Sequence, residues 1–321
     1  MRPTGSLHLG NYHGALKNWI ELQYEYDCYF FIADYHAFTT GYEDPSGFQK
    51  NAWTIVIDWL AAGLNPAVAT LFIQSRVPEH AELHLLLSMI TPLSWLERVP
   101  TYKELIEQLS EKDLSSIGFL GYPLLQTADV VMYDAHFVPV GEDQVPHLEL
   151  SREVVRRFHN YYGEVFVEPQ PLLTPTPRLP GLDNRKMSKS YGNTIDLSDD
   201  AETVKKKIRS MYTDPKRVRA DIPGTVEGNP VFIFHDAFNP NRAEVDDLKA
   251  RYREGKVGDV EVKTKLANAV NAMLDPIRER RQAATARREH IREILVEGSR
   301  KAQTIAQETM ERVRAAVKLK Y

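Results

Sequence analysis

Two short segments of the sequence combine small residues with groups that suit a phosphate. Residues 4–11 (TGSLHLGN) form a tight turn that runs into a predicted helix, and Gly10 permits close approach of the backbone. Free N–H groups at the start of that helix favour an anion, and His8 and Asn11 add short polar side chains. Residues 186–190 (KMSKS) place two lysines three positions apart on a loop of small residues. Such lysines are mobile positive charges suited to the oxygens of a departing pyrophosphate.

Each of these segments also has an ordinary structural explanation. A histidine near a glycine at a helix start can be explained as a simple helix cap, and a surface loop with two lysines is common. Glu142 and Asp143 are an acidic pair that a helix dipole favours, and Asp129 could be a buried, salt-bridged carboxylate. The two phosphate-type segments together in one chain are a more specific signal than either one alone.

The first half of the chain is expected to form the elements that position these residues. Apolar runs rich in β-branched and aromatic residues predict buried parallel strands at 29–33, 70–73 and 137–140, with helical patterns at 48–62 and 81–90 between them. This order predicts an α/β fold with a Rossmann-like, doubly wound parallel sheet, in which ligands bind beyond the carboxyl ends of the strands. A strand normally precedes the first glycine-rich turn, but here the turn stands at the start of the chain. We therefore expect a first, central strand to be missing from this chain or supplied otherwise.

The sequence after about Asp196 predicts helices only. Apolar residues repeat at spacings of three and four over 262–277 and 291–317. The segment 169–181 holds five prolines, so it cannot be helical and is the expected junction. Residues 276–321 hold 12 Lys and Arg against 6 Asp and Glu, whereas the preceding residues hold 28 against 38. A basic tail on an acidic body allows a localised phosphate-binding face, although a solvated helix is the more common explanation.

The composition of the 321 residues, 43% hydrophobic and 26% charged, suits two folded domains and excludes a disordered or collagenous chain. No apolar run reaches the roughly 18 residues of a membrane helix and the N-terminus is unlike a signal peptide, so we expect a soluble, cytoplasmic protein. Cys28, the only cysteine, excludes a disulfide framework and cysteine-rich metal sites. The histidine spacings match no zinc motif, so no metal site of the protein's own is predicted. His80 and His84 are expected to be a surface pair on one helix.

The two phosphate-type segments resemble the signatures of class I aminoacyl-tRNA synthetases, the first at His8–Asn11 and the second, residues 186–190, letter for letter. Residues 122–129 (YPLLQTAD) and 138–144 (VPVGEDQ) narrow the resemblance to bacterial tryptophanyl-tRNA synthetases. The resemblance covers the whole chain and is strongest before Asn193. The sequence departs from that family where Arg2 replaces a usual glutamine.

The resemblance implies a role for particular residues. Asp129 would accept the indole N–H of tryptophan, Tyr122 and Gln144 would hold its amino group, and His36 and Gln126 would border the pocket. Lys186 and Lys189 would be the catalytic residues. The ATP-binding residues that it implies are Arg2, Pro3, Thr4, His8, Gly10, Asn11, Gly141, Glu142, Asp143, Leu179, Lys186, Met187, Ser188, Lys189 and Ser190.

The resemblance further implies the activity and the organisation of the chain. The activity would be ATP-dependent activation of L-tryptophan and its transfer to tRNA(Trp), with Mg2+ bound as Mg-ATP. Residues 1–195 would be the catalytic nucleotide-binding domain, residues 196–292 a helical anticodon-binding domain, and residues 293–321 a C-terminal helix that packs back on the catalytic body. A homodimer through helices in the region 78–125 is expected, with no membrane association.

Three alternatives remain open at this point. The spacing from Gln126 to Asp129 also suits the phenolic hydroxyl of tyrosine, which would make the chain a tyrosyl-tRNA synthetase. The apparently truncated start would suit a non-catalytic synthetase paralogue, and the phosphate signature alone would suit a small nucleotidyltransferase.

For the synthetase interpretation, a further expectation concerns four arginines. Their joint neutralisation should weaken tRNA charging and spare adenylate formation; they are Arg280, Arg281, Arg287 and Arg288.

Overall fold

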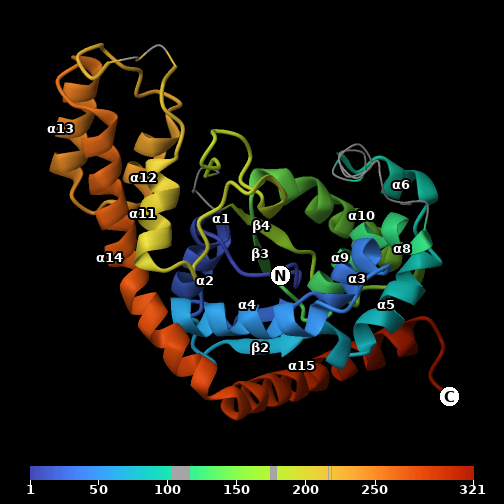
Figure 1. Cartoon of the computed structure of the whole chain (residues 1–321). Coiled ribbons are helices and arrows are strands. Elements are labelled where there is room, and N and C mark those ends of the chain that lie inside the picture. The colour runs from blue at the N-terminus through green and yellow to red at the C-terminus, as the bar shows by residue number, and fades with distance from the viewer. Residues whose placement is uncertain (101, 103–115, 174–178, 216, 218) are drawn as a thin grey trace.

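The computed structural model describes residues 1–100, 102, 116–173, 179–215, 217 and 219–321. It has a body of strands and helices and an arm of helices that rises from one side of it (Figure 1). The elements of the body are α1 (Leu9–Asn11), η1 (Tyr12–Leu16), α2 (Lys17–Leu22), β1 (Tyr29–Ile32), α3 (Asp34–Gly41), α4 (Phe48–Ala62), β2 (Thr70–Ile73), η2 (Gln74–Arg76), α5 (Glu79–Ser88), α6 (Leu93–Glu97), α8 (Ile117–Leu120), α9 (Tyr122–Val131), β3 (Phe137–Val140), η3 (Glu142–Gln144), α10 (Val145–Tyr162), β4 (Gln170–Leu173) and η4 (Lys189–Tyr191). The arm and the C-terminal helix follow as α11 (Ala201–Arg209), α12 (Pro230–Phe238), α13 (Arg242–Arg253), α14 (Asp259–Ala286) and α15 (Arg288–Ala316).

The strands pair in parallel, as the sequence predicts. β1 pairs with β2 and β3 pairs with β4, which gives two two-stranded sheets within the described residues. The predicted strands at 29–33, 70–73 and 137–140 are confirmed, and so is the helix at 48–62. β4 lies inside the proline-rich segment that was expected to be only a junction, because proline is tolerated in an edge strand. The α/β fold followed by helices is therefore confirmed.

Met1 lies beside β1 on the edge that β2 leaves open. Its amino group donates to Phe31 O at 2.5 Å, and its carbonyl accepts from Ala33 N at 2.9 Å. This is the hydrogen-bond pattern of one parallel rung. A cavity of about 640 Å³ adjoins it, lined by residues of β1 and β3 and by the side chains of Tyr26 and Tyr133. Burial lowers the pKa of the Met1 amino group to about 5, because the charged form loses its hydration there.

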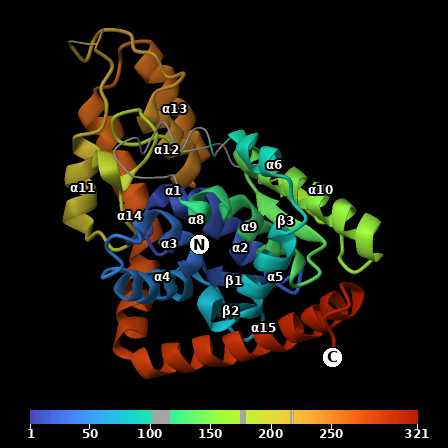
Figure 2. The same ribbon diagram turned by 90° about the vertical axis from the view of Figure 1, so that its right-hand side faces the viewer.

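The two longest helices connect the arm to the body. α14 packs against α11 and α12 in the arm and against α4 in the body, and α15 then runs under the body beside β2 and α5 (Figure 2). The C-terminal helix begins at Arg288 rather than at residue 293. Trp59 of α4 is fully buried at the centre of the resulting core. In the described part of the chain, none of the helices is both long and apolar enough to cross a lipid bilayer.

Gly298 permits the close packing of α15 on β2. A Cβ atom at this position would stand 1.9 Å from the carbonyl oxygen of Leu71, a backbone atom that cannot move aside alone. We expect Gly298→Ala to lower the free energy of unfolding by about 1–3 kcal/mol through overpacking. Urea unfolding followed by circular dichroism measures this. Gly14→Ala is the matched control, because a Cβ there meets nothing within 4 Å and alanine favours helix; equal losses in both variants would contradict the explanation.

Candidate active site

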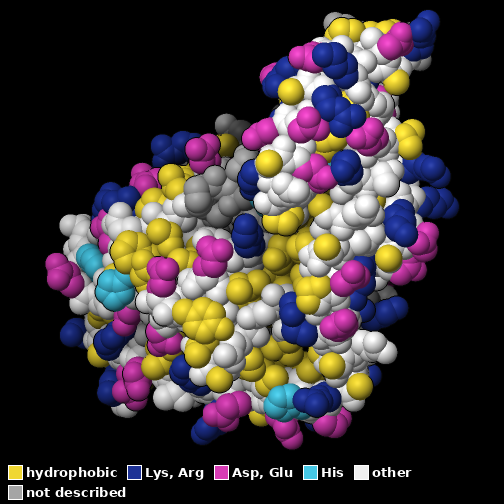
Figure 3. Space-filling view, turned by 90° about the vertical axis from the view of Figure 1, so that its left-hand side faces the viewer, with side chains coloured by type: hydrophobic (Ala, Val, Ile, Leu, Met, Phe, Trp, Pro, Cys, Tyr) yellow, Lys and Arg dark blue, Asp and Glu magenta, His cyan; other side chains and the backbone are white. Residues whose placement is uncertain are grey.

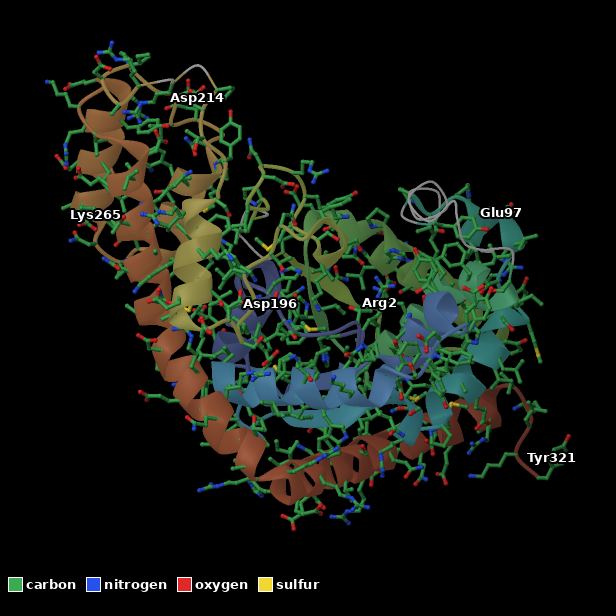
Figure 4. All side chains as sticks on the ribbon, viewed as in Figure 1. Arg2, Glu97, Asp196, Asp214, Lys265 and Tyr321 are labelled. Carbon is green, nitrogen blue, oxygen red and sulfur yellow. The ribbon has the colours of Figure 1, made fainter. Side chains whose placement is uncertain are left out.

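A pocket of about 580 Å³ lies at the carboxyl ends of β1 and β3. It is lined by residues that follow those strands, Ala33 and His36 after β1 and Gly141 and Asp143 after β3. This is where ligands bind in open parallel sheets. Figure 4 shows Arg2, which also lines the pocket, in the middle of the body, and Lys265 far away on the arm.

The structure brings all five residues predicted for the amino-acid pocket together. Each of them lines this one cavity: His36, Tyr122, Gln126, Asp129 and Gln144. They come from α3, α9 and η3, which are distant in the sequence. Their proximity therefore follows from the fold and not from local spacing. Their binding roles stay a prediction.

Asp129 is the most buried charged group of this pocket, with 6% of its surface exposed. His36 Nε2 lies 2.8 Å from its Oδ2, while Gln74 Nε2 and His80 Nδ1 lie 2.7 and 2.6 Å from its Oδ1. Burial acts to raise the pKa of the carboxyl group, but hydrogen bonds from His36 and His80 outweigh it and hold that pKa below its ordinary value. Asp129 is therefore an ionised, acceptor-only group at neutral pH.

His80 was expected on the surface, and that expectation is wrong. Its side chain is fully buried and its two ring nitrogens contact Asp129 and Tyr133. Gln74, also fully buried, is the other partner that the sequence analysis missed. Its position directly after the strand at 70–73 was a usable signal, because strand ends carry the site. No such sequence signal marked His80, because a helical pattern does not show which face of the helix meets a carboxylate from another helix.

The first signature forms a compact helix start. His8 Nδ1 accepts from Asn11 N at 3.3 Å, and Asn11 Oδ1 accepts from His8 N at 3.1 Å, which is a reciprocal cap of α1. The capping explanation considered for His8 is therefore confirmed. Burial, with the charge of Lys189, lowers the pKa of His8 to about 4, so its ring is neutral at pH 7.

The two signatures lie side by side although about 180 residues separate them. Lys189 Nζ lies 3.4 Å from Thr4 O. A Cβ at Gly10 would be 2.9 Å from the sulfur of Met187, so the glycine permits the approach of the second signature. The chain after that signature pairs back onto the first, with Leu9 N donating to Ile195 O at 2.8 Å.

Asn193 holds the lysine loop in shape. Its Oδ1 accepts from Ser188 N at 2.8 Å, and its Nδ2 donates to Asp183 at 2.7 Å and to Lys186 O at 3.0 Å. Burial lowers the pKa of Lys189, while Asp196 and Asp58 act in the opposite direction. The loop therefore presents its lysines from a fixed turn.

The fifteen residues predicted to bind ATP divide into three groups. Arg2, Gly141, Asp143 and Lys186 line the 580 Å³ pocket. Pro3 and Leu179 are buried residues that are not among the lining residues, and Glu142 is the first residue of η3. The others lie in the two signatures and are not among the lining residues, namely Thr4, His8, Gly10, Asn11, Met187, Ser188, Lys189 and Ser190.

Three of the four arginines expected to face tRNA make contacts within the chain. Arg280 Nε donates to Ala61 O at 2.6 Å, and Arg281 Nε donates to Asp58 Oδ1 at 2.8 Å. Arg288 lies over the ring of Trp53, 5.1 Å from its centroid. On the arm, basic and acidic side chains are interspersed, while hydrophobic side chains gather on the body beside it (Figure 3). These contacts give the three arginines a structural role within the chain, which the expected role in tRNA charging did not include.

Comparisons with known proteins agree with this geometry. The model of the class I tRNA synthetase family for tryptophan and tyrosine (W and Y) matches residues 1–275. Tryptophan–tRNA ligases of Ralstonia nicotianae and Thermotoga maritima are 44% and 46% identical, each match covering 100% of this chain and 98% of the relative. The crystal structure of tryptophanyl-tRNA synthetase from Campylobacter jejuni, complexed with ADP and tryptophan, is 34% identical with a TM-score of 0.87 and covers 99% of this chain and 98% of its own.

Proposed function

We infer how the site works from the premise that this chain belongs to the class I tRNA synthetases of the tryptophan and tyrosine family. Its activity is the ATP-dependent ligation of tryptophan to tRNA. The tyrosine alternative is set aside because relatives at 42–47% identity over the whole chain are tryptophan–tRNA ligases. The observation that supports our residue assignments best is the position of a buried, ionised Asp129 in a pocket that Lys186 of the second signature also lines.

We propose that adenylate formation relies on positioning and charge rather than on proton transfer. The tryptophan carboxylate attacks the α-phosphorus of ATP, a new O–P bond forms, and the bond to the bridging oxygen breaks to release pyrophosphate. Lys186 and Lys189 neutralise the charge that develops on pyrophosphate. No group of three or more His, Cys, Asp or Glu side chains that could hold a metal occurs among the described residues. We therefore propose that Mg2+ enters with ATP, on its phosphate oxygens.

Tryptophan specificity would come from Asp129. Its Oδ2 atom accepts the indole N–H, while Tyr122 and Gln144 hold the amino group and His36 and Gln126 border the ring. An amino acid without a matching donor leaves the remaining acceptor position on Oδ2 of this buried carboxylate unfilled, and such mismatches give discrimination of about 10⁴ to 10⁵. Phenylalanine is therefore rejected without an editing site.

The arm would bind the tRNA. We propose that residues 196–292 contact the anticodon stem, that residues 293–321 anchor the arm to the catalytic domain of residues 1–195, and that the 2'-hydroxyl of the terminal adenosine takes the tryptophanyl group. The support is the continuous helix α14, which belongs to both the arm and the body (Figure 1). Since the substrate is tRNA, we place the protein in the cytoplasm.

A second copy of the chain would cover the face formed by α5, α6 and α8, which Figure 2 turns toward the viewer. Large apolar side chains are exposed there: Leu85 by 54%, Met89 by 70%, Leu93 by 56% and Ile117 by 88%. Exposed apolar patches of this kind mark subunit interfaces. The expected dimer region of residues 78–125 includes this patch, and residues 101 and 103–115 of that region lie outside the described residues.

We expect the wild-type chain to elute as a dimer and the Met89→Lys, Ile117→Lys double variant as a monomer. Burying two lysines against the apolar partner face costs desolvation free energy, which opposes association. Size-exclusion chromatography with light scattering measures the mass. Val260→Lys is the control, because this side chain is 68% exposed on the arm and outside the patch. A monomeric wild type would contradict the dimer.

The reaction itself is tested by amino-acid-dependent exchange of pyrophosphate into ATP. We expect exchange with tryptophan and none with tyrosine or phenylalanine. Preferred exchange with tyrosine would contradict the assigned specificity, and no exchange with any amino acid would favour the non-catalytic paralogue.

A further inference from the structure

The carboxylate of Asp129 receives donors from three separate elements. Gln74 reaches it from η2, His80 from α5 and His36 from α3, at 2.6 to 2.8 Å. Two of these donors, Gln74 and His80, share the Oδ1 atom, and only His36 contacts Oδ2. A carboxylate oxygen has two lone-pair directions, so Oδ1 is saturated while Oδ2 keeps one acceptor position.

The protons of His80 are fixed by its two neighbours. Asp129 is ionised and can only accept, so Nδ1 of His80 carries a proton and donates it. Tyr133 Oη lies 2.7 Å from Nε2 on the other side of the ring. Burial, together with the charge of Asp129, raises the pKa of Tyr133, so its hydroxyl keeps its proton and is able to donate it to Nε2. A neutral imidazole with its proton on Nδ1 satisfies both contacts.

This chain of donors is packed too tightly to rearrange freely. His80 is fully buried and its ring lies against those of Phe31, Phe72 and Tyr133, with centroids 5.5 to 6.2 Å apart. Tyr133 in turn stacks on Tyr29 of β1 at 4.9 Å. The imidazole therefore cannot turn away from Asp129 without opening a cavity in the core.

We propose that His80, oriented by Tyr133, is a positioning residue that saturates Oδ1 of Asp129 and so leaves one acceptor, on Oδ2, for the N–H of the substrate side chain. The proposal rests on the proposed binding role of Asp129 and adds the reason for its selectivity. A carboxylate free to rotate would offer up to three acceptor positions to water or to a misplaced side chain. His80, held by Tyr133, and Gln74 together reduce these to one, at the orientation in which an indole is held.

The test compares His80→Leu, which removes the donor at similar volume, with His80→Asn, whose amide places an N–H where Nδ1 stands. We expect His80→Leu to raise the KM for tryptophan in pyrophosphate exchange by about 10- to 100-fold, the effect of losing a hydrogen bond to a charged group. The KM for ATP should change by less than about two-fold. The preference for tryptophan over phenylalanine should fall by about 10-fold, and His80→Asn should recover most of both losses.

Tyr133→Phe is the milder variant and keeps the test usable if His80→Leu does not fold. It should raise the KM for tryptophan by about 2- to 10-fold, because Nδ1 still donates but the ring loses its second anchor. His290→Leu is the matched control, because this histidine is exposed on α15 and pairs there with Glu293, and it is expected to change the KM for tryptophan by less than about two-fold. The 15N shifts of the His80 ring should show the proton on Nδ1 in the wild type.

Three outcomes would overturn the proposal. The first is an equal rise in the KM for ATP and for tryptophan in His80→Leu, which would indicate general loss of structure. The second is no recovery in His80→Asn. The third is an unchanged KM for tryptophan in His80→Leu. Asp129→Asn separates the two levels of inference. If Asp129→Asn leaves the KM for tryptophan unchanged, the proposed function of Asp129 fails; if it raises that KM while His80→Leu does not, only the positioning role of His80 fails. In the Asp129→Asn background the effect of His80→Leu should disappear.

Discussion

Replacing Asp129 by asparagine is expected to lower kcat/KM for tryptophan by roughly 10²- to 10⁴-fold, mostly through KM. The amide has the shape of the carboxylate but no charge, and it has one acceptor atom instead of two. With Gln74 and His80 donating at the Oδ1 position, the amide nitrogen stands at the Oδ2 position and faces both the donor of His36 and the indole N–H. Two donors then meet without an acceptor, and the buried groups lose their pairing.

Pyrophosphate exchange with tryptophan, tyrosine and phenylalanine measures this effect. The preference over phenylalanine should fall with the affinity, since the wild-type discrimination depends on one buried acceptor. Asp236→Asn is the control, because this carboxylate pairs with Lys249 on the surface of the arm, and exposed pairs contribute only about 0–1 kcal/mol. An unchanged preference over phenylalanine in Asp129→Asn would show that pocket shape alone selects the substrate.

Replacing Arg281 by methionine is expected to lower the free energy of unfolding by about 3–5 kcal/mol, since the fully buried Asp58 would lose its charged partner. Asp58 also accepts from Leu7 N at 3.1 Å, directly before His8 of the first signature. The loss should therefore extend to adenylate formation, with a higher KM for ATP. This replaces the expectation that Arg281 acts only on tRNA charging.

Urea unfolding at several pH values tests the reason for this loss. Burial raises the pKa of Asp58 even though Arg281 and Leu7 N act to lower it, and removing Arg281 raises it further. A group whose folded-state pKa is raised stabilises the fold at low pH, and that contribution is lost as the pH rises through the folded pKa. The deficit of Arg281→Met should therefore shrink as the pH falls through the carboxyl range. Arg287→Met, at an exposed position directly after the last residue of α14, should change stability by less than about 0.5 kcal/mol. A deficit that does not depend on pH would contradict the buried-charge explanation.

Much of the fold could be predicted because its signals are local. The strands at 29–33, 70–73 and 137–140 are short apolar runs, and the helix at 48–62 has the bounds that its pattern indicates. Strand β4 was missed because the prolines of the segment 169–181 suggest a junction, and an edge position tolerates the one proline that β4 contains, Pro171. The two signatures were recognised because each is a short continuous run of residues, the turn at 4–11 and the paired lysines at 186–190, which can be identified without knowing the fold.

The sequence by itself determined the class of fold, the two phosphate-type segments, the family and five of the residues that line the pocket, namely His36, Tyr122, Gln126, Asp129 and Gln144. Only the tertiary structure decided which buried polar groups meet: His80 and Gln74 at Asp129, Arg281 at Asp58, and Met187 against Gly10. The physical reason is that hydrophobic periodicity shows which face of an element is buried, whereas a buried hydrogen bond depends on contacts between elements that are distant in sequence. A histidine on a helix has the same pattern whether it faces water or a carboxylate, and packing alone distinguishes the two.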